Sequence, residues 1–481
     1  MRAPWLLIGV GCAQFGLVAL LLVMFSPPVA FGLAAAIPAV AAILLWPPLG
    51  AYVVAATLIG NWPWNLSRHV GMVATGSALL WVLRTRRPLF PRSPLLWLMG
   101  LYTLLVLAST INPPTRELIW PAALVHVSFL ALTWLFVSVV DDRRRVRVVV
   151  SLMVGSGVVT AAVGFVQARA HFVWPASTTA YALTQEINRG QSGLDLQGWQ
   201  GRFRIDSITG TPDFLPLYLQ SLMPFVFFWL VRQESRRRRL LGMAVLLMFG
   251  VAHLLSYTRG PILTTAIVAF LMGWMVSRRR VLAFTPGAAV LAFAGLMAWA
   301  PMRERLLAAA TSGVEELEST AWRVGTIPIG IEMMLRRPLL GVGIGQQQLN
   351  WPESAAHLVP MVPGAVAPLH NSYLMAGAEL GVGGLLVLVA LIGVAWRQLA
   401  ATARRFEALG ETELASYARA CLVAFIGVAV AMLGYPMLGS FRYLWLLLAL
   451  AAALVRTAER MALTPEVEGP RDRVSPHAAR A

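Results

Sequence analysis

Apolar stretches of about 20 residues recur along almost the whole chain, separated by short polar segments. Each stretch is long enough to cross the hydrocarbon core of a bilayer as a helix. The pattern predicts roughly fourteen spans, at residues 5–25, 29–46, 48–62, 70–83, 95–111, 118–140, 147–168, 211–231, 240–256, 261–277, 282–300, 370–396, 417–436 and 440–456. The third and fourth are short and also fit one re-entrant pair, which leaves about twelve full spans.

The composition agrees with a membrane protein. Of 481 residues, 58% are hydrophobic and 13% are charged, against roughly 45–50% and 25% in soluble domains, which excludes a typical soluble enzyme. Alternating ten-residue strands are absent from the sequence, which argues against a barrel and leaves helices as the spanning elements. We therefore predict an all-α, polytopic integral membrane protein with about 12–14 transmembrane helices.

The positive charge follows the span boundaries. The formal net charge is +17, and all 39 basic residues are arginine. They occur in short clusters between spans, a distribution that sets membrane orientation and does not indicate nucleic-acid binding. With both termini in the cytoplasm, every cluster falls on the cytoplasmic side, at Arg84/Arg86/Arg87/Arg92, Arg143/Arg144/Arg145/Arg147, Arg232/Arg236/Arg237/Arg238/Arg239, Arg278/Arg279/Arg280, Arg397/Arg404/Arg405 and Arg456/Arg460.

The rest of the sequence predicts no cofactor, and it divides the chain into regions. Cys12 and Cys421 both lie in apolar stretches and give no disulfide framework, and no His/Cys spacing predicts a metal site. We read 5–25 as a retained first helix. We divide the chain into transmembrane helices at 1–199, a catalytic region at 200–396 with a long outer loop at 301–369, further helices at 397–462, and a disordered cytoplasmic tail at 463–481.

Unusual polar residues mark the outer starts of three spans that run from outside to inside. Arg202 and Arg204 precede the start at Thr211-Pro212, Arg259 precedes the start at Gly260-Pro261, and His370 lies at the start of the third. Helix N-termini and arginines together favour a phosphate or diphosphate. Because the neighbouring surface is membrane, we expect a lipid that carries its phosphate at headgroup level.

Plainer interpretations exist for each residue. Arg202 and Arg204 fit exposed loop charges, Arg259 fits an arginine that reaches lipid headgroups, and His370 fits an interfacial or capping residue. Asp213 fits a residue that binds a cation or assists the site, but at the first turn of a helix such a residue more often caps the helix. Glu379 is interpreted as structural, because nine residues from His370 correspond to about 180° of helix rotation.

The ordered combination of three segments resembles the O-antigen ligase / polymerase (Wzy-C) superfamily of bacterial membrane glycosyltransferases. The resemblance covers roughly residues 200–395. It rests on Ser256-Tyr257-Thr258-Arg259-Gly260, on Arg337-Pro338-Leu339-Leu340-Gly341-Val342-Gly343-Ile344-Gly345, and on His370-Asn371-Ser372-Tyr373-Leu374 followed by Glu379-Leu380-Gly381.

The resemblance implies an inverting, metal-independent glycosyltransferase of a GT-C-like fold, without cofactor, in the bacterial inner membrane. It would transfer a glycan from undecaprenyl diphosphate to an acceptor on the periplasmic or outer face, in lipopolysaccharide or polysaccharide biosynthesis. Lipid A core, a growing polysaccharide and a protein hydroxyl remain equally open as acceptors. The resemblance implies catalytic roles for His370 and Arg259, with His370 as base or positioner.

Further residues around this site receive expected roles. Arg204 and Arg202 would join Arg259 in binding the diphosphate. Four residues are expected to position the acceptor or the sugar, the tryptophans by stacking: Asn371, Tyr373, Trp322 and Trp351.

A transporter or flippase of an anionic lipid-linked substrate is the alternative function. Transporters are expected to show internal symmetry or discontinuous helices in both halves, and neither is clear in the sequence. The polar residues also cluster on one face, which favours surface chemistry. We therefore expect an enzyme.

Overall fold

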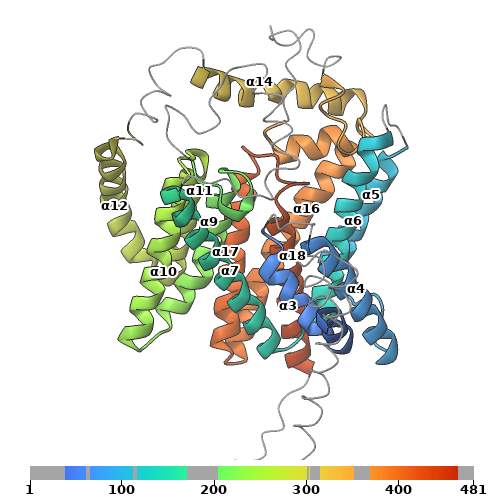
Figure 1. The fold of residues 1–481 in the computed structure, drawn as a ribbon, viewed down its shortest axis with the longest axis horizontal. Coiled ribbons are helices and arrows are strands. Elements are labelled where there is room, and N and C mark those ends of the chain that lie inside the picture. The colour runs from blue at the N-terminus through green and yellow to red at the C-terminus, as the bar shows by residue number, and fades with distance from the viewer. Residues whose placement is uncertain are drawn as a thin grey trace, which may run out of the picture.

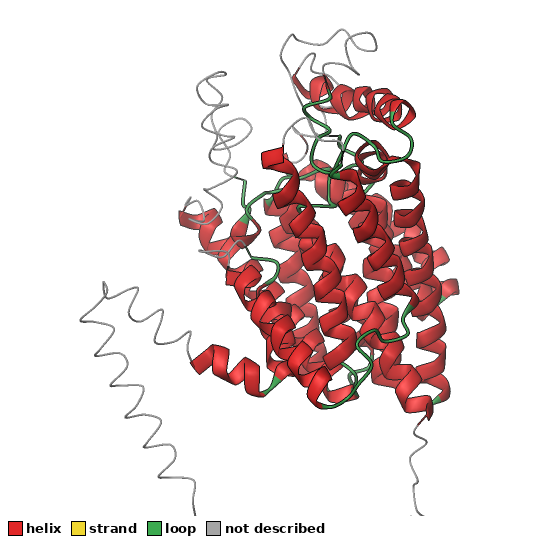
Figure 2. Ribbon diagram, turned by 90° about the vertical axis from the view of Figure 1, so that its right-hand side faces the viewer, coloured by secondary structure: helices red, strands yellow, loops and turns green. Residues whose placement is uncertain are grey.

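The computed structural model describes residues 38–60, 66–111, 116–170, 204–300, 303, 315–351 and 369–463, without the side chains of 116–118, 288–289, 291–292 and 315–324. The described residues are mostly helical, joined by loops and turns, and include no strand (Figure 2). The protein is therefore an all-α polytopic membrane protein, as the sequence predicted.

The helices follow the apolar stretches closely. Their bounds are α3 Pro47–Thr57, α4 Leu66–Arg84, α5 Pro94–Ser109, α6 Arg116–Val139, α7 Arg143–Ala170, α9 Phe214–Val231, α10 Arg236–Leu255, α11 Gly260–Val276, α12 Arg278–Ala298, α14 Glu315–Arg336, α16 Ser372–Ala408, α17 Thr412–Ala431 and α18 Arg442–Leu463. A 3₁₀ turn, η4, spans Ser207–Thr209.

Within the described residues, seven helices are long and apolar enough to cross a membrane, namely α4, α6, α7, α9, α10, α16 and α17. Two shorter apolar helices, α5 and α11, accompany them. The expected first span at 5–25 and the tail from 464 lie outside the described residues, so the predicted total of 12–14 spans stays a prediction. The largest boundary difference is in α16, which continues to Ala408, well beyond the predicted end at 396.

The spanning helices form a bundle, and α14 lies across one end of it (Figures 1 and 2). We call this end the α14 end. α14 packs on α16, where Gly330 lies against Leu369 and Leu374, and Gly377 lies against Met334. The long segment before α16 thus includes a helix that packs on the bundle.

α16 is broken at Gly381, whose φ of 73° is left-handed. The segment 337–345 packs against this break. Val382 N–H donates to the Pro338 carbonyl at 2.9 Å, and Val342 N–H donates to the Ala378 carbonyl at 2.8 Å. A Cβ on Gly381 would lie 2.4 Å from the Pro338 carbonyl oxygen. Glycine at this position therefore allows the two backbones to approach and satisfy each other's polar groups.

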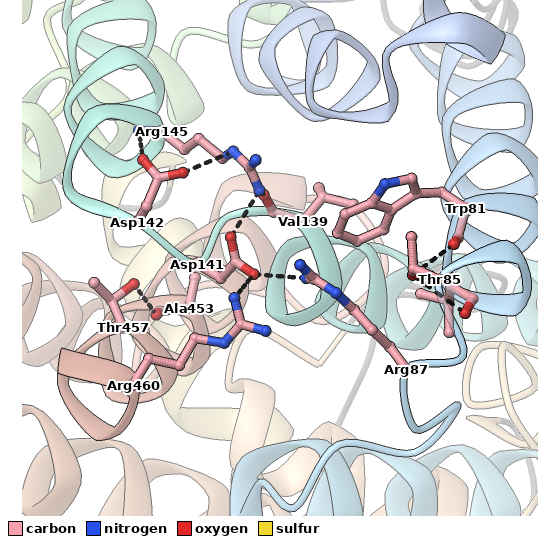
Figure 3. Close-up of polar contacts among 11 residues, drawn as sticks. Trp81, Thr85, Arg87, Val139, Asp141, Asp142, Arg145, Ala453, Thr457 and Arg460 are labelled. Atoms are coloured by element: carbon pink, nitrogen blue, oxygen red, sulfur yellow. Dashed lines mark hydrogen bonds and ion pairs between the residues drawn. The ribbon is translucent and has the colours of Figure 1, made fainter. Parts of the chain in front are cut away.

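At the opposite end of the bundle, a buried carboxylate gathers three arginines (Figure 3). Asp141, between α6 and α7, accepts hydrogen bonds from Arg87 at 2.8 Å, from Arg145 at 2.7 Å and from Arg460. Its side chain is only 4% exposed. Arg87 follows α4, Arg145 lies on α7 and Arg460 on α18. The cluster therefore ties together helix ends that are far apart in sequence.

Candidate functional site

Arg204 connects the start of α9 to the loop between α10 and α11. Its Nε donates to the Ser256 carbonyl at 3.0 Å, and its Nη2 donates to Thr258 Oγ1 at 2.9 Å. The same Nη2 pairs with Asp213 Oδ1 at 3.2 Å. The Arg204 side chain stays 26% exposed. The guanidinium is thus fixed in direction while part of it remains accessible.

Thr258 lies between two segments and bonds to both. Its hydroxyl accepts from Arg204 and donates to the Pro212 carbonyl at 3.0 Å. The preceding residue, Tyr257, has a left-handed φ of 51°, a conformation that is costly for a non-glycine residue and is often retained at functional sites. Its ring packs against Trp299, with centroids 5.5 Å apart. Arg259, which follows Thr258 in the chain, is half-buried and occupies the N-cap position of α11.

The start of α16 is anchored by its own side chains. Ser372 Oγ donates to the Tyr435 carbonyl at 2.6 Å and accepts from Met437 N–H at 2.8 Å. Ser372 N–H donates to the Met432 carbonyl at 2.8 Å. These bonds fix the start of α16 against the connection between α17 and α18, and the half-buried His370 lies two residues before Ser372.

The same connection, residues 432–441, also receives the other two helix starts. A Cβ on Gly260 would lie 2.4 Å from the Tyr435 hydroxyl, so only glycine allows α11 to begin this close to Tyr435. Phe441 packs against Phe214 at the start of α9, with ring centroids 5.4 Å apart. The three starts that the sequence singled out therefore meet on one connection at the α14 end.

The segment after Arg204 is held by α7. Gln167 Oε1 accepts from the backbone N–H groups of Asp206 at 3.1 Å and Ser207 at 2.7 Å, and its Nε2 donates to the Asp206 carboxylate. Burial raises the pKa of Asp206, and the Gln167 hydrogen bond partly offsets this rise. Ser207, with a left-handed φ of 53°, donates to the Thr160 carbonyl at 2.6 Å.

Sequence reasoning missed Gln167, Ser372 and Tyr435. A glutamine inside an apolar span was the available signal for Gln167, because a polar amide in such a span needs a partner. The capping interpretation of Asp213 was wrong. Asp213 occupies the N-cap position of α9 but makes no side-chain cap bond. Its carboxylate pairs with Arg204 instead, and Thr211 Oγ1 accepts from Phe214 N–H at 3.3 Å.

The residues expected to position acceptor or sugar have packing or capping contacts in this structure. Asn371 Oδ1 caps α16, accepting from Tyr373 N–H at 2.9 Å and Leu374 N–H at 3.1 Å. The Tyr373 hydroxyl donates to the Ala429 carbonyl at 2.8 Å. Trp351 is 2% exposed in an apolar cluster with Met333 and other residues, so its buried ring favours packing over the predicted sugar stacking. Arg202 and the side chain of Trp322 lie outside the described residues.

Glu379 has a structural position, as expected, but His370 precedes the first residue of α16, so the helix rotation between the two residues does not apply. It is 1% exposed, and its carboxylate accepts a hydrogen bond from the Gly345 amide. Its backbone carbonyl accepts from Gly343 N–H at 3.1 Å. Glu379 therefore fixes the segment 337–345 against the break in α16.

Across the described residues, no three His, Cys, Asp or Glu side chains are close enough together to hold a metal ion. Residues 243–389 match the family model of the O-antigen ligases. The match includes Arg259, the segment 337–345 and His370, whereas Arg204 precedes it. No curated protein matches the chain. The apolar helices and the family match together support a multi-pass protein of the inner membrane. The match over residues 243–389 supports the O-antigen ligase and polymerase superfamily of membrane enzymes for this chain.

Proposed function

We propose that the protein transfers a glycan from undecaprenyl diphosphate to an acceptor hydroxyl at the α14 end, which faces the periplasm. The observation that carries this proposal is the meeting of three helix starts on residues 432–441, with Arg204, Arg259 and His370 at those starts. Helix starts and arginines offer N–H donors and positive charge to a diphosphate.

The reaction is a single displacement at the anomeric carbon. The acceptor oxygen forms a bond to this carbon as the bond to the diphosphate oxygen breaks, so the configuration inverts. The electron pair of the broken bond leaves with the lipid diphosphate. His370 accepts the hydroxyl proton or orients the hydroxyl. Lipid A core, a growing polysaccharide and a protein hydroxyl all fit this chemistry as acceptors.

The two arginines have different surroundings. Arg204 shares its charge with Asp213 at 3.2 Å, and a carboxylate this close weakens its attraction for a second anion. Arg259 begins α11, where unpaired backbone N–H groups add to its charge. We therefore assign the larger share of leaving-group stabilisation to Arg259 and a positioning share to Arg204.

The test is glycan transfer by the purified, detergent-solubilised protein. It is mixed with an undecaprenyl-diphosphate oligosaccharide and candidate acceptors in EDTA, and both transfer and lipid-diphosphate release are followed. Arg259→Ala should lower turnover by about a hundredfold or more, as for loss of an oxyanion-hole donor. His370→Ala should lower it by a similar factor.

Arg169→Ala is the matched control, because Arg169 is an exposed arginine at the end of α7 and should leave turnover within a few-fold of wild type. If Arg259→Ala also stayed within a few-fold, its proposed role would be wrong. Donor binding without transfer, together with movement of the lipid between leaflets in proteoliposomes, would favour the transporter. Transfer that stops in EDTA would overturn the metal-independent mechanism.

A further inference from the structure

A cavity of about 390 Å³ lies between α3, α4 and α6, next to the start of α18. Its volume falls within the range of about 300–1,000 Å³ that is typical of ligand sites. It is separate from the candidate site, because none of Arg204, Arg259 and His370 lines it. Most of its wall is apolar, and includes Val54, Met72, Leu124, Leu132 and Leu135.

Two arginines form the charged part of the cavity wall, Arg68 near the start of α4 and Arg442 at the start of α18. Arg442 is half-buried and donates to Ser67 Oγ at 3.3 Å. Arg68 is close enough for its charge to act on Arg442. Among the described residues, neither arginine forms an ion pair with a carboxylate. The segments 61–65 and 112–115, which flank α4 and α6, contain no acidic residue, and Glu117 in the first turn of α6 is among the residues whose side chains are not described.

Arg68 is exposed and Arg442 is half-buried. The two neighbouring positive charges repel each other, and the apolar wall leaves Arg442 poorly solvated. An anion between them would remove both costs, and a phosphate offers oxygens that an arginine binds in bidentate fashion. The wall beyond the arginines is mostly apolar, with Ser67, Thr75 and Ser128 as its other polar residues. It fits a hydrocarbon chain attached to the phosphate.

The cavity is also accessible from the membrane side. Met72 on α4 is 57% exposed and Leu124 on α6 is 49% exposed, and both line the cavity. In a bilayer these exposed apolar side chains contact lipid. A lipid can therefore enter between α4 and α6 without crossing water.

We propose that this cavity binds one membrane phospholipid with an anionic headgroup. The phosphate lies between Arg68 and Arg442, and an acyl chain lies along the wall formed by α4 and α6. This site does not depend on the proposed glycan transfer, because its residues and its ligand are different.

Two glycines on α4 provide a matched pair of variants. A Cβ on Gly71 or on Gly76 meets nothing within 4 Å, so both helix positions accept a larger side chain. Gly71 lines the cavity and Gly76 does not. Gly71→Leu therefore fills the cavity, whereas Gly76→Leu makes the same chemical change outside it.

The experiment measures lipid binding to the full-length, delipidated protein in nonionic detergent by native mass spectrometry. Phosphatidylglycerol and phosphatidylcholine with identical acyl chains are compared. The wild type should bind one phosphatidylglycerol about tenfold more tightly than phosphatidylcholine, which corresponds to about 1.4 kcal/mol. Arg442→Gln should remove most of this preference, and raising the salt concentration should weaken it. Gly71→Leu should reduce binding of both lipids, and Gly76→Leu should bind as the wild type does.

Three results would overturn the proposal. The first is equal binding of the two lipids by the wild type. The second is unchanged lipid binding by Gly71→Leu. The third is displacement of the lipid by millimolar inorganic phosphate, which would indicate a site for a small free anion. Because glycan transfer is not measured, failure here leaves the proposed function untouched, and failure of transfer leaves this lipid site untouched.

Discussion

Single hydroxyl groups connect backbone segments around the candidate site, and Thr258 shows how. Its hydroxyl both accepts from Arg204 and donates to the Pro212 carbonyl. A hydroxyl can satisfy both neighbours at once, because it carries one donor and two acceptor lone pairs. The direction of the Arg204 guanidinium therefore depends on a residue that need not touch the substrate.

Replacing Thr258 by valine should lower the kcat of glycan transfer by about tenfold. Valine keeps the shape but removes one hydrogen bond from the Pro212 carbonyl and one from Arg204, which still donates to the Ser256 carbonyl and to Asp213, at a cost of ~1 kcal/mol per bond. Thr258→Ser retains the hydroxyl and should restore kcat to near the wild-type value. Steady-state kinetics of both variants checks this positioning role. Equal losses in the valine and serine variants would point to packing of the threonine methyl group instead.

Gly381 allows the backbone of α16 to come close to the segment 337–345 at the break in this helix. Gly381→Ala should lower the free energy of unfolding by about 1–3 kcal/mol, because alanine resists the left-handed conformation and its Cβ would clash with the Pro338 carbonyl oxygen. Gly393 on the same helix has open space around its Cβ position, so Gly393→Ala should be neutral or stabilising. Thermal unfolding in detergent compares the two. A Gly381→Ala protein as stable as the wild type would show that the break is not needed.

At the scale of elements, the ends of α4, α7 and α18 are joined through Asp141 (Figure 3). One buried carboxylate faces three arginines, so its loss leaves several positive charges without a counter-charge. The helices beside this cluster contact one another mainly through apolar side chains. The cluster therefore contributes a directional link among elements whose other contacts are less specific.

Asp141→Asn should destabilise the protein by about 1–3 kcal/mol. Breaking a fully buried ion pair costs about 3–5 kcal/mol, and this is reduced here because the arginine side chains remain 25–35% exposed and are screened by solvent. Glu332→Gln is the control, since it removes one side of a partly exposed pair with Arg336 within α14. This pair should contribute under about 1 kcal/mol. Thermal unfolding of both variants provides the comparison, and equal effects would contradict a special role for Asp141.

At the scale of the whole molecule, the apolar periodicity predicted most helices within a few residues, because membrane-spanning helices must satisfy their backbone internally and fit the bilayer. It could not predict the length of α16, whose last turns are amphipathic and leave the apolar stretch. The three helix starts were found because proline and hydroxyl residues mark them. Gln167 and Tyr435 were not found, because their contacts depend on which helices become neighbours. Asp213 was misread for the same reason, since its arginine partner comes from tertiary packing.

The orientation of the bundle gives the last prediction, because the arginine clusters at the ends of the helices away from α14 should face the cytoplasm. In a Cys12→Ser, Cys421→Ser background, Leu349→Cys should react with a membrane-impermeant maleimide in intact cells whose outer envelope admits the reagent. Leu349 is 46% exposed between α14 and α16. Ser235→Cys, directly before Arg236–Arg239, should react only after the inner membrane is permeabilised. The reverse pattern would place the candidate site in the cytoplasm, where a donor diphosphate lipid would have to be used before it crosses the membrane.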